Sequence, residues 1–286
     1  MAITHLPPSG PVTATLNFYT PPPDGSAPYN HVDTPPTDLP QRNFSDSPHA
    51  VPITDIRGSE SQHNLDTSAF QAILAVPQQP SATDFTSPTS IQTTYYPEIT
   101  SLLLSHIPGS NRVIIFDHTI RRAQRDAART PVQRVHIDQT ATSAAMRVRK
   151  HVPDAEEADR LLAGRYRIVN VWRPLNKNPV ESFPLAFASS ATLADEDVVP
   201  VEHRYGNGYT GYTAAIRHNP AQRWYYLSGM TGDERLLLEC FDSEALKPGS
   251  AVKGGRVAHS AFTDPRTRAD AEGRESIEVR ALVFGP

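Results

Sequence analysis

The sequence contains a single cysteine, Cys240, among its 286 residues. One thiol can form neither an intrachain disulfide nor a thiolate zinc cluster, so we expect a reducing, cytoplasmic setting. The sequence also has no large excess of charge of one sign, because 27 Lys and Arg residues nearly balance 31 Asp and Glu residues and leave a formal net charge of −4. This balance gives no electrostatic footprint for nucleic acid or an anionic membrane, and the expected partner is a small molecule.

Long apolar runs are missing as well. No stretch of 18 apolar residues occurs, and residues 1–8 have neither the basic start nor the apolar core of a secretion signal. At 31.4 kDa the chain can bury a sizeable core without disulfides. We therefore expect one domain over residues 1–286.

Residues 1–60 are rich in Pro, Ser, Thr and Asp, and within them residues 12–19 alternate as a strand does. We expect the rest of this stretch to form an extended, Pro-rich N-terminal arm on the domain surface. Such arms often reach across to a partner subunit, so a homodimer is the preferred assembly. A disordered tail over residues 21–50 is the alternative, because this composition buries little apolar surface.

The remaining pattern predicts helices first and strands later. Helices are expected from Pro97 to near Pro108, from Asp154 to a stop at Gly164, and over residues 120–129. One buried strand is expected at residues 111–116, and short strands follow at 166–172, 185–188, 223–228, 236–241 and 275–284. This order predicts a mainly β fold, a barrel or jelly roll flanked by helices.

Two copies of a His-x-Asp motif occur, and about one His-x-acid match is expected by chance in a chain of this composition. His31-Val32-Asp33 lies in a Pro-rich stretch, which indicates a loop. His136-Ile137-Asp138 follows Val132 in an alternating run, which places His136 and Asp138 on the same face of a strand. Only this second copy has a rigid platform for metal binding.

Two further features lie far downstream of this motif. His259 follows His136 by 123 residues, and Arg274-Glu275-Ser276 begins 15 residues after His259. Two imidazoles and one carboxylate can hold one face of an Fe(II) ion, and an Arg-x-Ser can bind a carboxylate. Alternation also places Arg280 on the face of Arg274 and Ser276, so the two arginines compete for that role. A salt bridge with Glu278 or another acid is the alternative for Arg280.

Several motifs occur in a characteristic order, and together they resemble the fungal hydroxylase/desaturase family of Fe(II)/2-oxoglutarate-dependent oxygenases. They are residues 135–138, 170–175, 224–226, 241–243, 259–262 and 274–280. The resemblance extends over nearly the whole chain from about Val12. It implies a double-stranded β-helix, with the metal-binding core at about residues 130–286, and Fe(II) held by His136, Asp138 and His259. It further implies 2-oxoglutarate, O2 as co-substrate, and a natural product of secondary metabolism as substrate.

Four other residues are candidates for the pocket. Asn170 and Trp172 share a strand face that the resemblance places beside the cofactor, although a structural Trp in the core is the alternative. Tyr225 and Arg173 are weaker candidates for substrate contact. Tyr225 could simply pack, and Arg173 lies on the opposite face unless the strand ends at Pro174.

The predicted function is therefore oxidation of a small natural product by hydrogen abstraction, with 2-oxoglutarate converted to succinate. Hydroxylation or desaturation is expected, with endoperoxide formation as a variant, and no residue decides between these outcomes. A β-barrel that binds a metal or small molecule without redox turnover is the alternative. A metal hydrolase is a third hypothesis, which leaves the Arg-x-Ser motif without a use.

Overall fold

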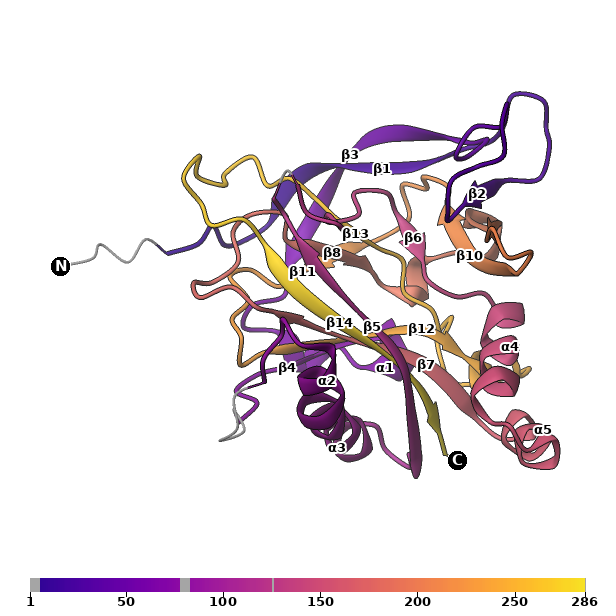
Figure 1. Ribbon diagram of the computed structural model, residues 1–286. Helices are drawn as coiled ribbons and strands as arrows, with labels where there is room; N and C mark the ends of the chain where they lie inside the picture. Colours follow the sequence, from indigo (N-terminus) through magenta and orange to yellow (C-terminus); the bar gives the residue numbers. More distant parts are fainter. Residues whose placement is uncertain (1–5, 78–82, 125, 286) are drawn as a thin grey trace.

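The computed structural model describes residues 6–77, 83–124 and 126–285 of the chain. Two β-sheets lie face to face around most of the apolar core, and the helices lie outside them (Figure 1). The expected class, mainly β with flanking helices, is confirmed. Within the described ranges, no helix combines the length and apolar character needed to cross a membrane. The expectation about a secretion signal concerns residues 1–8, of which 1–5 lie outside the described residues.

The larger sheet carries the elements that the sequence associated with metal binding. Most of its neighbouring strands are antiparallel, but β11 pairs with β3, and β2 with β9, in parallel. Its strand order is β1 (Val12–Thr20), β3 (Ser45–Asp55), β11 (Trp224–Tyr226), β8 (Leu185–Ala188), β13 (His259–Ala261), β6 (His136–Ile137), β10 (Thr210–Ile216), β9 (Val198–Arg204) and β2 (Tyr29–His31).

The smaller sheet is antiparallel and has a polar inner side. Its order is β4 (Phe70–Ile73), β12 (Arg235–Asp242), β7 (Tyr166–Pro174), β14 (Glu275–Phe284) and β5 (Arg112–Arg122). Alternation divides β7 between two environments. Val169 and Val171 pack outward in one apolar cluster with Ile99 of the flanking helix, whereas Trp172 packs in a different cluster with Leu185 of the larger sheet.

The helices cover the smaller sheet and one end of the structure (Figure 1). The longer ones are α3 (Tyr96–His106), α4 (Ala141–His151) and α5 (Ala155–Ala163); the short elements are α1 (Leu65–Ser68), α2 (Pro88–Ser90), a π-helical turn at Ile91–Tyr95, and 3-10 turns at Glu60–Gln62, Ser190–Thr192, Asp195–Asp197 and Ser243–Leu246. The side chain of Asp154 caps α5 by accepting the backbone N–H of Glu157 at 2.8 Å. The predicted helices that correspond to α3 and α5 are thus present.

The helix expected over residues 120–129 is wrong. β5 continues to Arg122 and pairs with β14 as far as Arg122 opposite Glu275, and residue 125 lies outside the described residues. Pairing with a long partner strand outweighs the local helical pattern here. α4 was not predicted, although Thr140 and Ser143 form a capping box at its start. β9 and β10, which flank the turn at residues 206–208, were not predicted either.

The Pro-rich N-terminal stretch supplies β1, β2 and β3 of the larger sheet. β1 pairs with β3 along its whole length, from Val12 opposite Ile53 to Thr20 opposite Ser45. Between them, β2 pairs with β9 and ends at His31, so the loop predicted for His31-Val32-Asp33 begins only after His31. The stretch for which a disordered tail was the alternative, residues 21–50, is therefore anchored by strand pairing at residues 29–31 and 45–50, with loops between them.

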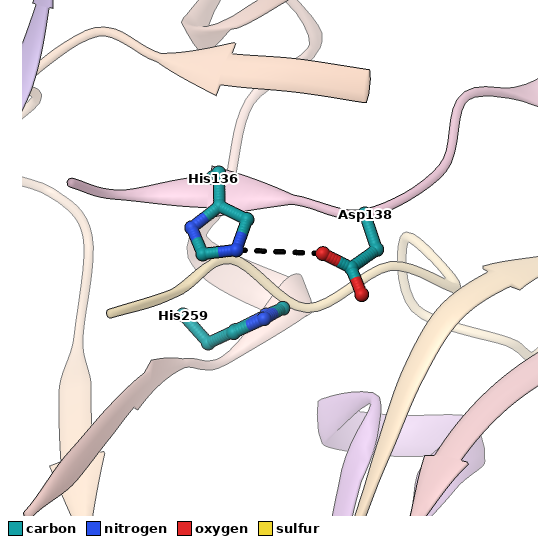
Figure 2. Close-up of side chains that lie close together, drawn as sticks. All are labelled: His136, Asp138 and His259. Atoms are coloured by element: carbon teal, nitrogen blue, oxygen red, sulfur yellow. Dashed lines mark ion pairs between the residues drawn. The ribbon is translucent and has the colours of Figure 1, made fainter. Parts of the chain in front are cut away.

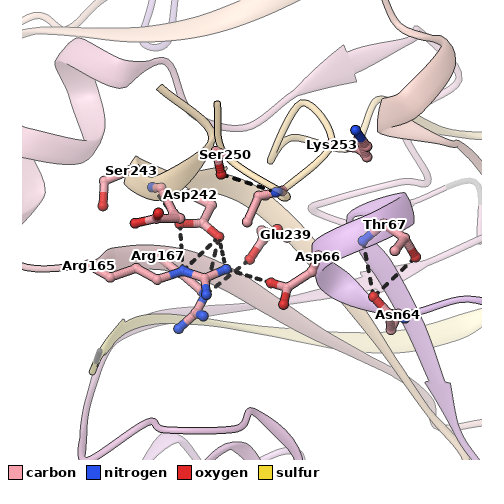
Figure 3. Close-up of polar contacts among 12 residues, drawn as sticks. Asn64, Asp66, Thr67, Arg165, Arg167, Glu239, Asp242, Ser243, Ser250 and Lys253 are labelled. Atoms are coloured by element: carbon pink, nitrogen blue, oxygen red, sulfur yellow. Dashed lines mark hydrogen bonds and ion pairs between the residues drawn. The ribbon is translucent and has the colours of Figure 1, made fainter. Parts of the chain in front are cut away.

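A buried charged cluster joins β7 to β12 at the end of the sheet near α1 (Figure 3). Arg165 donates to Asp242 at 2.5 Å and to Asp66 at 2.5 Å, and Arg167 donates to the same Asp242 carboxylate at 3.3 Å. The Asp242 side chain is fully buried. Burial also raises the pKa of neighbouring Glu239, which lies 3.5 Å from Arg167, well above its usual value. Asp242 is the carboxylate that the two guanidinium groups share.

We predict that Asp242→Asn lowers the free energy of unfolding by about 3–5 kcal/mol, because it leaves buried guanidinium charge uncompensated. The measurement is urea unfolding followed by circular dichroism. Asp159→Asn is the control, because its ion pair with Arg149 is more than half exposed and should contribute about 1 kcal/mol at most. Equal losses in the two variants would contradict this assignment.

Candidate metal centre

His136, Asp138 and His259 come together although their sequence positions are far apart (Figure 2). His136 lies in β6, Asp138 directly follows that strand, and His259 begins β13. Backbone pairing brings His259 directly opposite His136. One potential ligand atom from each of the three residues lies within 4.8 Å of the others. Strand pairing thus brings together His136 and His259, which are 123 residues apart in the sequence.

Backbone carbonyls orient both imidazoles. His136 Nδ1 lies 2.7 Å from the carbonyl oxygen of Arg134, and His259 Nδ1 lies 3.4 Å from that of Val257. A proton on Nδ1 that is donated to a carbonyl leaves Nε2 with a free lone pair. Nε2 of His136 lies 3.4 Å from Oδ1 of Asp138, so this nitrogen and the carboxylate point into the same space.

The second oxygen of Asp138 is held by two residues of the opposite sheet. Oδ2 accepts hydrogen bonds from Asn170 Nδ2 and Arg280 Nε, both at 2.8 Å. Asn170 and Arg280 are themselves cross-strand partners on β7 and β14. Their contacts fix the carboxylate so that Oδ1 faces His136 and remains available to a cation.

Arg280 has further partners on the inner side of the smaller sheet. Its Nη1 donates to Asp117 and Thr119 at 3.0 Å, and its Nη2 donates to Glu278 at 2.5 Å. The alternative role considered for Arg280, a salt bridge with Glu278, is therefore present. With Asp138 included, three carboxylates surround this guanidinium.

The electrostatics of the cluster favour a bound cation. Burial alone would raise the pKa of Asp138, but Arg280, His136 and His259 hold it well below the usual value. Burial, together with His136, lowers the pKa of His259 to about 3. At neutral pH the site therefore presents a carboxylate and an uncharged imidazole, the forms that bind metal.

A pocket between the two sheets opens onto His136 and His259. Arg274 and Ser276 are both almost fully buried in it, and the Arg274 guanidinium lies 5.7 Å from the centre of the Trp172 ring. Arg274 donates to the carbonyl of Phe183 at 2.6 Å and forms no ion pair with any described residue. The pocket is lined by Thr119, Arg121, Val132, His136, Trp172, Leu185, His259, Ala261, Arg274, Ser276 and Glu278.

The structure does not bring every predicted residue to this pocket. Tyr225 lies in an aromatic cluster, with ring centres 5.0 Å from His63 and 5.6 Å from Phe70. Arg173 lies over the rings of Phe85 and Tyr95 on the outer side of β7. β7 does end at Pro174, but the Arg173 side chain still lies with these outer aromatic rings, so its position gives no support to the substrate contact considered for it.

Sequence reasoning missed the contribution of β5 to the pocket. Thr119 and Arg121 line it because they are paired with Glu278 and Ser276 of β14. The signal was available in the alternation of Asp117, Thr119 and Arg121. The helix predicted over residues 120–129 hid this alternation, because it included Arg121.

The donor set fits one metal in particular. Two imidazole nitrogens and one carboxylate oxygen on one side of a pocket, with open positions opposite, are typical of non-haem Fe(II) oxygenases. Among the residues that the structure describes, His136, Asp138 and His259 form the group of His, Cys, Asp and Glu side chains that lie close enough together to hold a metal ion. His31 and Asp33, the other copy of the motif, do not belong to this group.

Comparisons with known proteins agree with this donor set. A family model described as an oxidoreductase/YMDC permease-like domain matches residues 16–284. The hydroxylase/desaturase poxK of Penicillium oxalicum is 40% identical, over 97% of this chain and 92% of its own length. The Fe(II)/2-oxoglutarate-dependent dioxygenase nvfI of Aspergillus novofumigatus is 32% identical, over 86% of each chain. A solved structure of the iron and alpha-ketoglutarate-dependent endoperoxidase NvfI superposes with a TM-score of 0.85 at 29% identity, covering 97% of this chain and 99% of that one.

The fold and the comparisons define an Fe(II)/2-oxoglutarate-dependent oxygenase with a jelly-roll core. The chain belongs to the hydroxylase/desaturase family of fungal secondary metabolism, as the sequence motifs indicated. The predicted fold class, enzyme class and cofactors are thereby confirmed.

We predict that Asn170→Ala weakens divalent metal binding about ten- to hundredfold, because Asp138 loses a hydrogen bond that orients it. Isothermal titration of the metal-free protein with Mn(II) measures this affinity. Asn178→Ala is the control, since that side chain is exposed and bonds to Glu272. Unchanged affinity in Asn170→Ala would show that Arg280 alone positions the carboxylate.

Proposed function

We propose that the protein oxidises a small natural product at a carbon–hydrogen bond, by hydroxylation or desaturation. The observation that carries this proposal is the convergence of His136, Asp138 and His259 beside a pocket. This pocket contains Arg274, which forms no ion pair with any described residue. When bound, Fe(II) with 2-oxoglutarate and O2 would supply the oxidant: 2-oxoglutarate would lose CO2 and take up one oxygen atom of O2 to give succinate, and the other oxygen atom would oxidise the substrate and end in its hydroxyl group or in water. Endoperoxide formation is a second candidate, because NvfI is named an endoperoxidase.

The residues of this chain have separate tasks in the proposed reaction. His136, Asp138 and His259 hold the metal on one side and leave the pocket side open. Asn170 and Arg280 keep the Asp138 carboxylate oriented. Trp172 forms an apolar wall of the pocket and helps to exclude water from the co-substrate.

Arg274 and Ser276 are proposed to bind the distal carboxylate of 2-oxoglutarate. Arg280 is less suited to this role, because three carboxylates already surround its guanidinium. Arg274 has a backbone carbonyl as partner instead, and burial lowers its pKa to about 9. A carboxylate ligand would provide the missing counter-charge.

An anaerobic spectrum tests the function directly. We expect a weak visible charge-transfer band that appears only when Fe(II) and 2-oxoglutarate are both added. His259→Ala removes a ligand and should abolish the band, whereas the exposed His218→Ala should retain it. Wild-type protein that binds iron without giving a band would instead support a non-redox binding protein or a hydrolase.

The choice between the two arginines has its own test. We predict that Arg274→Gln raises the Kd for 2-oxoglutarate about thirtyfold or more without changing Mn(II) affinity, because a buried charge-assisted contact of about 2 kcal/mol or more is lost. Arg280→Gln should mainly weaken metal binding, since its partner is Asp138. The reverse pattern, with 2-oxoglutarate affinity lost only in Arg280→Gln, would exchange the two assignments.

We further propose that the chain forms one oxygenase domain over residues 1–286, works in the cytoplasm and assembles as a homodimer. The single cysteine, which is buried, supports a reducing setting. The N-terminal arm, residues 1–60, supports the dimer, and light scattering of the purified protein measures its mass in solution. The small net charge gives no reason to expect nucleic acid or a membrane as partner.

A further inference from the structure

Two arginines in the metal pocket lack acidic partners. Arg121 and Arg274 both line it, and neither forms an ion pair within the described part of the chain. Arg274 is almost fully buried and Arg121 is partly buried. Arg167 and Arg235, which are as buried as Arg274, contact Asp242 and Glu98. A guanidinium that is removed from water without a counter-ion is unfavourable, so two arginines without acidic partners in one pocket point to an anionic ligand.

Strand register places these two arginines around one residue. Arg121 on β5 is the cross-strand partner of Ser276 on β14. Arg274 precedes Ser276 by two residues and lies in the same pocket. Arg121 lies on the β5 side of Ser276, whereas Arg274 extends toward Trp172 and the carbonyl of Phe183. The Ser276 side chain therefore lies between two cationic groups.

The protein itself does little to neutralise this pair. To the residues that the structure describes, Arg121 makes one hydrogen bond, from Nη1 to the carbonyl of Thr130 at 3.1 Å, out of the five N–H donors of a guanidinium. Glu278 and Asp138 are acids near Arg121, but both accept hydrogen bonds from Arg280, at 2.5 Å and 2.8 Å. Burial lowers the pKa of both Arg121 and Arg274, and the charge of Arg121 contributes to the lowering at Arg274.

We infer that Arg121 is a second binding residue for the distal carboxylate of 2-oxoglutarate, so that Arg121 and Arg274 clamp this carboxylate from the two sides of Ser276. This inference rests on the proposed function of the pocket. Two cations around one carboxylate make its charge a strict requirement, and 2-oxo acids that lack a distal carboxylate should bind poorly. Arg121 is thus a specificity-determining residue as well as an anchor.

Arg122 provides a matched control for Arg121. It is the next residue on β5, with its side chain about one-third exposed and paired with Glu275 at 3.2 Å. Arg121→Gln and Arg122→Gln remove the same charge from neighbouring positions on opposite faces of one strand. A difference between them therefore reports the pocket and not the net charge.

The experiment measures 2-oxoglutarate binding to the Fe(II) protein without O2, both by the visible band and by calorimetry. We expect Arg121→Gln to raise the Kd at least about tenfold while Mn(II) affinity stays unchanged, and Arg122→Gln to change the Kd less than about threefold. Arg121→Lys keeps the charge and should recover part of the affinity. Thermal unfolding of each variant identifies any loss of folding.

A second ligand separates charge recognition from shape. 2-Oxopentanoate has the chain length of 2-oxoglutarate but no distal carboxylate. The preference of the wild-type protein for 2-oxoglutarate over 2-oxopentanoate should fall at least about tenfold in Arg121→Gln and stay unchanged in Arg122→Gln.

The outcomes distinguish this inference from the proposed function. An unchanged 2-oxoglutarate Kd in folded Arg121→Gln overturns the clamp. A wild-type protein that gives no band, but binds 2-oxoglutarate in the calorimeter more tightly than Arg121→Gln does, overturns the oxygenase function and leaves the clamp intact. A wild-type protein that does not bind 2-oxoglutarate overturns both.

Discussion

The carboxylate of Asp138 is the contact on which the geometry of the site depends. It follows β6 of the larger sheet, while Asn170 and Arg280, which hold its Oδ2, lie on adjacent strands of the smaller sheet. The metal ligand set is therefore fixed across the space between the two sheets. Any change in the distance between the sheets would move Asp138 relative to His136 and His259. The geometry of the metal centre thus depends on how the two sheets of the jelly roll pack against each other.

Counter-charge separates the structural arginines from those available to ligands. Arg280 and Arg165 form ion pairs with acidic side chains of the protein itself, so their charges stabilise the fold. Arg274 and Arg121 lie in the metal pocket with backbone carbonyls as their hydrogen-bond partners. Because a buried charge needs compensation, an arginine with no protein anion is where a ligand anion is expected. The same residue type thus has two roles, which only its surroundings distinguish.

The sequence was sufficient to predict the parts of the site that depend on local alternation. His136 and Asp138 share a face, and the residues from Arg274 to Arg280 that were expected on one side of a strand do meet inside the molecule. The partners of each side chain could not be predicted, because they depend on which strands pair. Arg280 appeared equivalent to Arg274 until β14 was placed beside β5 and β7. Arg121 was missed for the same reason, since its importance comes from its position opposite Ser276.

The metal side and the substrate side of such a site are built from different kinds of structure. The three ligands are set by paired strands, which allow little local variation. The segment that leads into β6 is also contacted by the N-terminal arm, where Phe44 packs under the guanidinium of Arg134. The backbone carbonyl of Asn17 in β1 also accepts the N–H of Val135 at 2.9 Å, so the arm is tied to the segment that leads into His136. The register that brings His136 opposite His259 is thus supported by strands from both ends of the chain, and variation in the site is expected in its loops rather than in these strands.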